Sequence, residues 1–395
     1  MITTAPARRA GLAAIALGAL VLAGCSSTNS AGGGTGGEGS SNLTGDIAAG
    51  STGTMSQFTD ISGICPSDES AKVSVGVVDG YGTNTWSKTV LAEIESEAAK
   101  CAAISGVEFI AGRGDLEATT SGITSLAAKG TDIILVIPDA GPGEAHLPAI
   151  RQATQAGSTV VNFASDPQGT AGTDYLDYAD QIPSFVGKSK AQWIVDRLGS
   201  AGGNVVFFGG PSGALVSTQE YAGAKEVFDA NPQITLINSE PIWTNWDPAQ
   251  AQQAMAGVLS QGTPINAIIA DYGASASGVI RAYEAAGQTL PILTSTDDNS
   301  LSCGFADLKA KNPGYELATV SSRTWIGRVA LRKALAAKFG TADDEPSLYE
   351  LSLFEDSTGS AEGSKTPEEA CLPDAPSDAT PSTLLSSDEI TKLFG

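Results

Sequence analysis

Residues Lys72 to Trp86 read KVSVGVVDGYGTNTW, and this stretch decides the fold. Its first half, Val73 to Val78, is a short and almost continuously apolar run, which is typical of a strand buried on both faces of a parallel sheet. The run ends in a polar loop that contains Gly80 and Gly82. Ligands of open parallel sheets bind beyond the carboxyl ends of the strands, so this loop is the first candidate for a binding segment.

The amino terminus has the pattern of an export signal. Arg8 and Arg9 precede an apolar run that is too short for a comfortable transmembrane helix and that ends in Leu-Ala-Gly-Cys at Cys25. This ending resembles a bacterial lipobox, which implies removal of residues 1–24 and lipidation of Cys25; an ordinary signal peptide is the alternative. Residues 25–60 then form a Gly- and Ser-rich flexible linker. We therefore expect a lipid-anchored protein on the outer face of the cytoplasmic membrane.

The charge of the chain excludes several partners. It has 22 basic and 44 acidic residues, a formal net charge of −22 at pH 7, and loss of Arg8 and Arg9 with the signal would make it more negative. Nucleic acids and anionic membrane surfaces are therefore poor partners. The acidity favours solubility on an exported surface over calcium binding, because no spaced DxDxDG loop is present.

Four cysteines follow Cys25, and an even number in an exported chain indicates two disulfides with three possible connectivities. Zinc is the alternative, but the chain has no CxxC and a single histidine, His146. The lone histidine also excludes a Ser-His-Asp or Cys-His mechanism elsewhere in the chain. We expect no metal and no cofactor, and we expect His146, inside a helix-like stretch, to lie at the surface.

Apolar runs alternate with amphipathic segments along most of the chain, which predicts parallel sheets covered by helices on both faces. Strands are expected at 73–78, 107–111, 132–137, 158–163, 203–208, 233–239, 266–270, 290–295 and 316–320. Helices are expected near 86–103, 117–129, 145–156, 185–199, 218–230, 248–260, 275–286 and 324–339. More than 300 ordered residues are too many for one core, so two lobes are expected. The predicted fold class is therefore α/β with two lobes, and the ligand is expected to bind between them.

Carboxylates, amides and tryptophans follow these strands, and they suit a neutral polyhydroxylated ligand. Asp and Asn hydrogen-bond hydroxyls, while an indole covers the apolar face of a sugar ring. For each polar residue alone, a helix cap or a turn is the competing interpretation. The predicted ligand-binding set is Asp79, Asn84, Trp86, Asp139, Asn162, Gln219, Trp246, Asp271, Asp297, Asn299 and Arg323.

Four segments resemble motifs of one known family. Gly82 to Trp86 (GTNTW) resembles its Asn-Asn-Pro-Phe-Phe, and Thr244 to Asp247 (TNWD) its Ala-Asp-Trp-Asp. Pro291 to Asp298 (PILTSTDD) resembles its Val-Gly-Phe-Asp-Gly, and Glu316 to Ser322 (ELATVSS) its Leu-Ala-Ala-Thr-Ile-Ala-Gln crossover. Over roughly Lys72 to Gly340, the chain thus resembles the type I periplasmic solute-binding proteins of ABC sugar importers, the group of the ribose-binding protein.

The resemblance implies two Rossmann-like lobes joined by a three-segment hinge. The implied first lobe comprises residues 61–180 and 322–346, the second comprises 181–321 and 347–372, and 373–395 form a tail. Asn84 and Trp86 would bind sugar from the first lobe, and Trp246 and Asp297 from the second. The layout also favours the disulfides Cys65–Cys101 and Cys303–Cys371, because each pair would then lie within one lobe and leave the hinge free.

The chain departs from the family where ligand identity is decided. Ile137 replaces an Asn before Pro138, and either Ser165 or Asp166 stands where the family has a polar pair. The resemblance therefore implies the ligand class, a pentose, hexose or polyol, and leaves the individual compound open.

The implied function is that of a monomeric substrate-binding lipoprotein that captures a small carbohydrate and delivers it to the ABC permease subunits in the membrane, without catalysis. Three alternatives remain open. One is a receptor lipoprotein that presents the sugar to a sensor, and another is a binding protein for a nucleoside or another non-sugar molecule. The third is an exported glycosidase with paired carboxylates such as Asp297 and Asp298; these neighbours point apart on a strand, so this alternative is the weakest.

Overall fold

The computed structural model describes residues 49–66 and 72–395. The expected signal peptide, the lipidation site Cys25 and most of the expected linker lie outside the described residues. These described residues belong to one compact unit. No helix in the described ranges is both long and apolar enough to cross a membrane.

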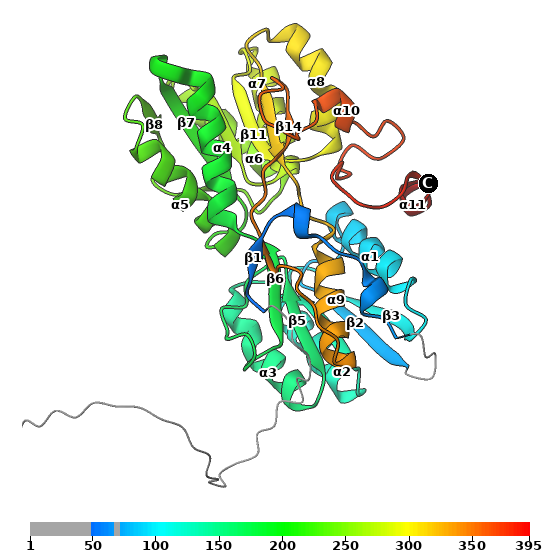
Figure 1. Cartoon of the computed structure of the whole chain (residues 1–395). Helices are drawn as coiled ribbons and strands as arrows, with labels where there is room; N and C mark the ends of the chain where they lie inside the picture. Colours follow the sequence, from blue (N-terminus) through cyan, green and yellow to red (C-terminus); the bar gives the residue numbers. More distant parts are fainter. Residues whose placement is uncertain (1–48, 67–71) are drawn as a thin grey trace, which may run out of the picture. The chain divides into compact units, whose positions relative to one another are not determined.

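The first lobe is built on a sheet of seven strands, all paired in parallel (Figure 1). In spatial order the strands are β1 (Thr52–Gly53), β13 (Leu348–Tyr349), β6 (Asp177–Gln181), β5 (Thr159–Phe163), β4 (Ile133–Ile137), β2 (Val73–Asp79) and β3 (Ile104–Ala111). The covering helices are α1 (Thr85–Ala98), α2 (Leu116–Ala128), α3 (Leu147–Gln155) and α9 (Ile326–Phe339).

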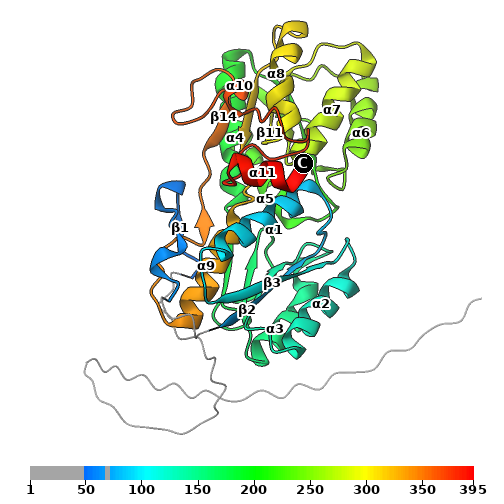
Figure 2. The same ribbon diagram turned by 90° about the vertical axis from the view of Figure 1, so that its right-hand side faces the viewer.

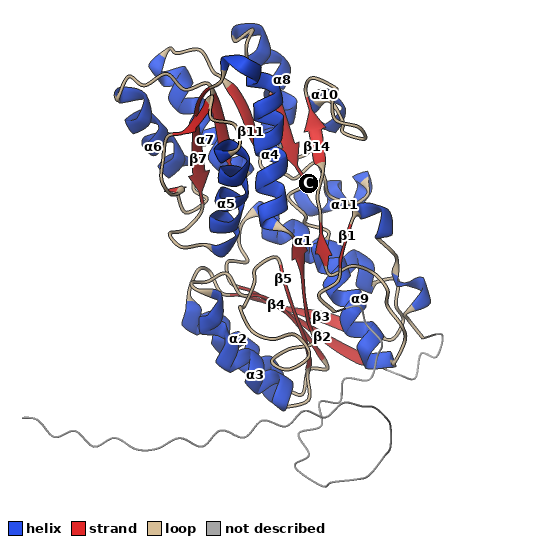
Figure 3. Cartoon of the chain, turned by 60° about the vertical axis from the view of Figure 1, so that its left-hand side comes forward, coloured by secondary structure: helices blue, strands red, loops and turns tan. Residues whose placement is uncertain are grey.

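The alternation of side chains along β2 explains why both faces of this sheet are covered. Val77 packs into the core cluster that includes residues of α1 and α9, whereas its neighbour Val78 packs with residues of α2 and α3. Successive side chains of a strand point to opposite faces, so an unbroken apolar run buries both. Figure 3 shows α2 and α3 on one side of the strands and α9 on the other.

The second lobe contains a mixed sheet in the order β14, β12, β11, β10, β7, β8, with β9 also paired to β7. Its strands are β7 (Gly203–Gly209), β8 (Ile234–Leu236), β9 (Ile242–Trp243), β10 (Ala267–Ala270), β11 (Ile292–Thr296), β12 (Leu317–Val320) and the antiparallel β14 (Leu353–Asp356). Its helices are α4 (Pro183–Leu198), α5 (Leu215–Asp229), α6 (Pro248–Ser260), α7 (Gly273–Ala286), α8 (Asn299–Lys311) and the short α10 (Pro367–Ala370).

The α/β fold with two lobes is therefore as predicted, and each strand and helix expected between residues 73 and 339 is present with shifts of a few residues at its ends. The chain passes between the sheets after β6, after β12 and after β13. The third crossing differs from the expected layout, because Leu348 and Tyr349 pair with Asp180 and Gln181 in the first sheet. That crossing thus occupies residues 350–352, and the second lobe resumes with β14.

Two other expectations about single segments need correction, and the tail can be described in more detail. Thr52–Gly53, placed in the flexible linker, forms β1 and pairs with β13. His146 is completely buried instead of exposed, and its Nδ1 lies 3.2 Å from the carbonyl oxygen of Gly143. The tail is an ordered segment that ends in α11 (Ser387–Phe394), which lies beside α1 of the first lobe (Figure 2).

The structure contains the disulfides Cys65–Cys101 and Cys303–Cys371, which is the pairing that the lobe layout favoured. The first joins the segment before β2 to the end of α1, and the second joins α8 to the end of α10. A disulfide typically stabilises a domain by about 2 to 4 kcal/mol. Each disulfide lies within a single lobe, so neither restrains the crossings.

Candidate functional site

A cavity of about 350 Å³ lies between the two lobes, and side chains from both line it. The first lobe contributes Tyr81, Asn84, Trp86, Ser87, Ile137, Asp139, Ala164 and Ser165. The second contributes Val216, Glu220, Asn245, Trp246, Pro248, Asp271, Tyr272, Ala274 and Thr296. Ser322 and Arg323 come from the second crossing, and Asp378 comes from the tail. This volume suits a ligand of the size of a monosaccharide.

The loop after β2 brings Asn84 to the cavity, and the first turn of α1 brings Trp86. Asn84 caps α1, because its side-chain oxygen accepts a hydrogen bond of 2.7 Å from the backbone N–H of Ser87. Trp86 is fixed by its indole N–H, which donates to the carbonyl oxygen of Ser322 at 2.8 Å. The first lobe thus holds one indole against the second crossing and leaves part of the ring at the cavity wall.

Two carboxylates lie close together below this loop. Asp79 ends β2 and accepts a hydrogen bond from the backbone N–H of Tyr81 at 2.9 Å. Asp139 follows β4, and a Cβ added to Gly80 would come within 2.1 Å of its Oδ1, so the glycine makes room for the carboxylate. Burial, reinforced by the charge of Asp79, raises the pKa of Asp139 well above its ordinary value. A protonated Asp139 would both donate and accept hydrogen bonds at the cavity wall.

The second lobe supplies Trp246 from the loop before α6. Its backbone is left-handed, with φ of 52°, which is uncommon for a bulky residue and is found mainly where function or tight turns require it. A Cβ on Gly210 would lie 2.2 Å from the indole, so the ring rests on that glycine. Across the cavity its ring meets Tyr81 edge to face, with centroids 6.2 Å apart. The indole is thus placed with little freedom.

Asp271 follows β10 and lies behind Trp246. Its Oδ2 accepts hydrogen bonds from the Ser217 hydroxyl, from the Gly210 N–H at 3.2 Å and from the Trp246 indole N–H at 3.3 Å. Its Oδ1 is buried and has no partner among the described residues. One oxygen therefore orients the tryptophan, and the other is available to a ligand in the cavity.

Arg323 stands on the second crossing and also has a left-handed backbone, with φ of 54°. Its Nε donates to Asp180 at 2.5 Å and one terminal nitrogen to the carbonyl oxygen of Ala164 at 3.1 Å. The guanidinium thereby lies against the first lobe while it lines the cavity. The guanidinium is thus a charged hydrogen-bond donor in a cavity whose other charged lining residues are the carboxylates Asp139, Glu220, Asp271 and Asp378.

The structure brings together about half of the predicted ligand-binding side chains. Those that line the cavity are Asn84, Trp86, Asp139, Trp246, Asp271 and Arg323. Those that lie outside its lining are Asp79, Asn162, Gln219, Asp297 and Asn299.

Four of the five residues outside the lining have a local reason for their place. Gln219 is one position away from the face of α5 that carries Glu220 to the cavity. Asn162 is fully buried within β5. Asp297 accepts backbone N–H bonds from Ser322 at 2.5 Å and Ser382 at 2.6 Å, and Asn299 binds backbone groups of the tail.

Among the charged lining residues, Glu220 and Asp378 were not in the predicted set. Glu220 is buried in an ion pair of 2.8 Å with Lys190, and Gln181 of the first sheet donates to it at 3.2 Å. The spacing of four residues from Val216 along α5 could have placed it on the cavity face. Asp378 carried no such signal, because it lies in an irregular segment without periodicity.

Burial, and next the charge of Glu220, raises the pKa of Asp271 to about 7. The folded protein therefore binds the carboxyl proton of Asp271 more tightly than the unfolded chain does, where this carboxyl titrates near pH 3.8. The stabilisation of the folded state by this protonation is complete below about pH 3.8 and is lost as pH rises through about 7. We expect Asp271→Asn to lose less thermal stability than the wild type between pH 4 and pH 7.

Melting temperatures at closely spaced pH values check this expectation. The variant should keep part of the decline, because burial also raises the pKa of Asp298 to about 7 and that of Glu355 to about 8. Equal slopes for variant and wild type would contradict the assignment to Asp271.

Comparison with protein families gives a match to the periplasmic binding protein domain over residues 75–337. The D-allose-binding periplasmic protein of Escherichia coli (strain K12) is 34% identical over 108 residues, which are 27% of this chain. That alignment spans 34% of the relative's length, so about a third of it is matched.

Solved structures share the fold. A galactofuranose binding protein superposes with a TM-score of 0.63 at 20% identity, covering 71% of this chain and 94% of its own. The Caulobacter myo-inositol binding protein bound to myo-inositol gives 0.61 at 21% identity, with 73% and 94% covered.

Proposed function

Because the chain belongs to the periplasmic binding protein domain family, we propose that it is the substrate-binding component of an ABC importer that captures a small neutral carbohydrate between its lobes. The ligand class is a pentose, a hexose or a polyol. The carbohydrate passes unchanged to the permease subunits in the membrane. Cys25 anchors the monomeric protein, through lipid, to the outer face of the cytoplasmic membrane.

One observation carries this proposal, the pair of indoles contributed by opposite lobes to one cavity. Trp86 lies on the first lobe and Trp246 on the second, and both line the same space. Indole faces cover the apolar C–H faces of sugar rings, and the polar side chains between them hydrogen-bond hydroxyls. D-Allose and myo-inositol, named for similar proteins, have these two kinds of surface.

The arrangement also supports a binding cycle. A ligand can close two lobes only if it binds the closed state more tightly than the open one. A sugar that touches both indoles meets this condition, since opening the crossings would remove it from one of them. We propose that the lobes move about the crossings after β6, β12 and β13 and that the closed form docks on the permease.

A thermal-shift screen tests the ligand class. We expect at least one of D-allose, myo-inositol and L-arabinose to raise the melting temperature, because a ligand at 100 times its dissociation constant adds about 2.7 kcal/mol to the free energy of unfolding. Amino acids and nucleosides serve as controls of similar size. Stabilisation by a nucleoside or an amino acid, with none by any sugar or polyol, would overturn the proposal.

A further inference from the structure

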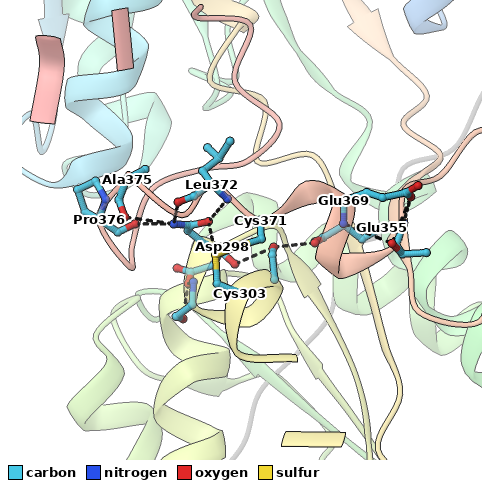
Figure 4. Close-up of a disulfide and its surroundings, with 12 residues drawn as sticks. Asp298, Cys303, Glu355, Glu369, Cys371, Leu372, Ala375 and Pro376 are labelled. Carbon is cyan, nitrogen blue, oxygen red and sulfur yellow. Dashed lines mark hydrogen bonds between the residues drawn. A yellow bond between two sulfur atoms is a disulfide. The ribbon is translucent and has the colours of Figure 1, made fainter. Parts of the chain in front are cut away.

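The segment after Cys371 is held firmly to the second lobe. The disulfide Cys303–Cys371 fixes its start to α8. Figure 4 shows these cysteines with Leu372, Ala375 and Pro376 gathered beside the helix. Both polar atoms of the Asn299 side chain form hydrogen bonds with the backbone of this segment. Its Nδ2 donates to the carbonyl oxygens of Leu372 at 2.8 Å, Pro376 at 3.1 Å and Ala375 at 3.3 Å, and its Oδ1 accepts from the Leu372 N–H at 2.8 Å.

The same segment continues to the first lobe. Its Ser382 N–H donates to Asp297 at 2.6 Å, and its Ser382 hydroxyl accepts from Ser321 on the second crossing at 2.8 Å. Immediately afterwards, the hydroxyl of Thr383 and the N–H of Leu384 donate to Glu93 of α1 at 2.6 and 2.7 Å. The tail therefore spans from one lobe to the other beside the cavity.

Asp378 lies between these two sets of anchors. It lines the cavity, and its Oδ2 accepts a hydrogen bond of 2.5 Å from Thr85, the first residue of α1. Its neighbours hold the backbone in place, since the carbonyl oxygens of Ser377 and Ala379 accept N–H bonds from Ser300 and Asn299 at 2.6 and 2.9 Å. Asp378 is exposed to solvent, and these contacts hold its carboxylate beside the cavity that it lines.

We propose that the tail is a wall of the ligand site and that Asp378 binds a hydroxyl of the ligand, making it a specificity-determining residue of this chain. The inference rests on the proposed function, because it assumes a ligand in this cavity. A carboxylate accepts hydrogen bonds and donates none, so it selects a compound with a hydroxyl at this position over its deoxy analogue. The tail lies beyond the family match, which ends at residue 337.

Calorimetric titration of the full chain tests the role of Asp378. The probe is whichever of D-allose, myo-inositol and L-arabinose gives the largest thermal shift. Asp378→Asn keeps the size of the side chain and removes its charge, and we expect about tenfold weaker binding. Asp374→Asn changes an exposed aspartate of the same tail outside the cavity lining and should bind like the wild type. Equal affinity of Asp378→Asn and wild type would overturn the inference.

A double variant separates positioning from direct contact. We expect Asn299→Ala to weaken binding by releasing the tail, and to cause no further loss when it is added to Asp378→Asn, since its effect on the ligand passes through that carboxylate. Additive losses would refute the positioning role of Asn299. If the wild-type chain binds none of the three compounds, the carbohydrate function itself fails, which is a different outcome from a bound sugar that ignores Asp378.

Discussion

We expect replacement of Trp246 by alanine to weaken binding of the cognate sugar at least tenfold, a loss of at least about 1.4 kcal/mol. The substitution removes the aromatic wall of the second lobe and its edge-to-face contact with Tyr81 of the first. It also frees the Oδ2 of Asp271 from one of its donors. Because the ring lines the cavity and also meets Tyr81 of the opposite lobe, we expect its loss to affect both affinity and closure.

Calorimetric titration measures the effect, and the chain offers a matched control. Trp243 lies three residues earlier, outside the cavity lining, and its indole N–H reaches Glu240 at 3.3 Å. Trp243→Ala should leave the dissociation constant within about twofold of wild type. If Trp246→Ala binds sugar as tightly as Trp243→Ala does, the cavity is not the sugar site.

The largest effect on stability is expected for Arg332→Met. Arg332 is completely buried on α9, where it binds Glu345 through Nε at 2.8 Å and Nη2 at 2.6 Å, and Glu97 through Nη1 at 2.8 Å. Its guanidinium also lies over the ring of Phe58, 4.5 Å from the centroid. Methionine leaves Glu97 and Glu345 buried with fewer counter-charges. Breaking such a pair from one side costs about 3 to 5 kcal/mol.

Urea unfolding of the variant checks this value. Lys225→Met is the control, because it breaks the exposed pair with Asp229, whose side chain is 64% exposed, and should cost less than about 1 kcal/mol. A cost below about 1 kcal/mol for Arg332→Met as well would show that the buried network adds nothing to folding. The network matters to the site because it seats α9, which follows the second crossing, on the first lobe.

Most strands and helices could be predicted from the sequence, because burial on two faces leaves almost continuous apolar runs such as Val73 to Val78. The strands β1, β6 and β9 were not predicted. The lobe layout required the family resemblance. The exact residues of the third crossing could not be predicted, because the sequence of Leu348 and Tyr349 does not indicate which of the two sheets a two-residue strand joins.

The cavity could be predicted only in part, for a similar reason. Trp86 and Trp246 have few structural roles in polar loops and were found. Asp297 was predicted from the family resemblance and Asn299 from its place after a strand, yet here they hold Ser382 and Leu372, which are 85 and 73 residues away along the chain. Such contacts depend on where the tail folds, and local sequence carries no signal of them.

The proposed function requires that one carbohydrate binds per chain and is released unchanged. Calorimetric titration of the wild-type protein with the compound that stabilises it most, followed by recovery of that compound and its chemical identification, measures both properties. We expect a stoichiometry of one and quantitative recovery of the intact sugar or polyol. Conversion of the sugar during the titration, or binding restricted to amino acids or nucleosides, would contradict it.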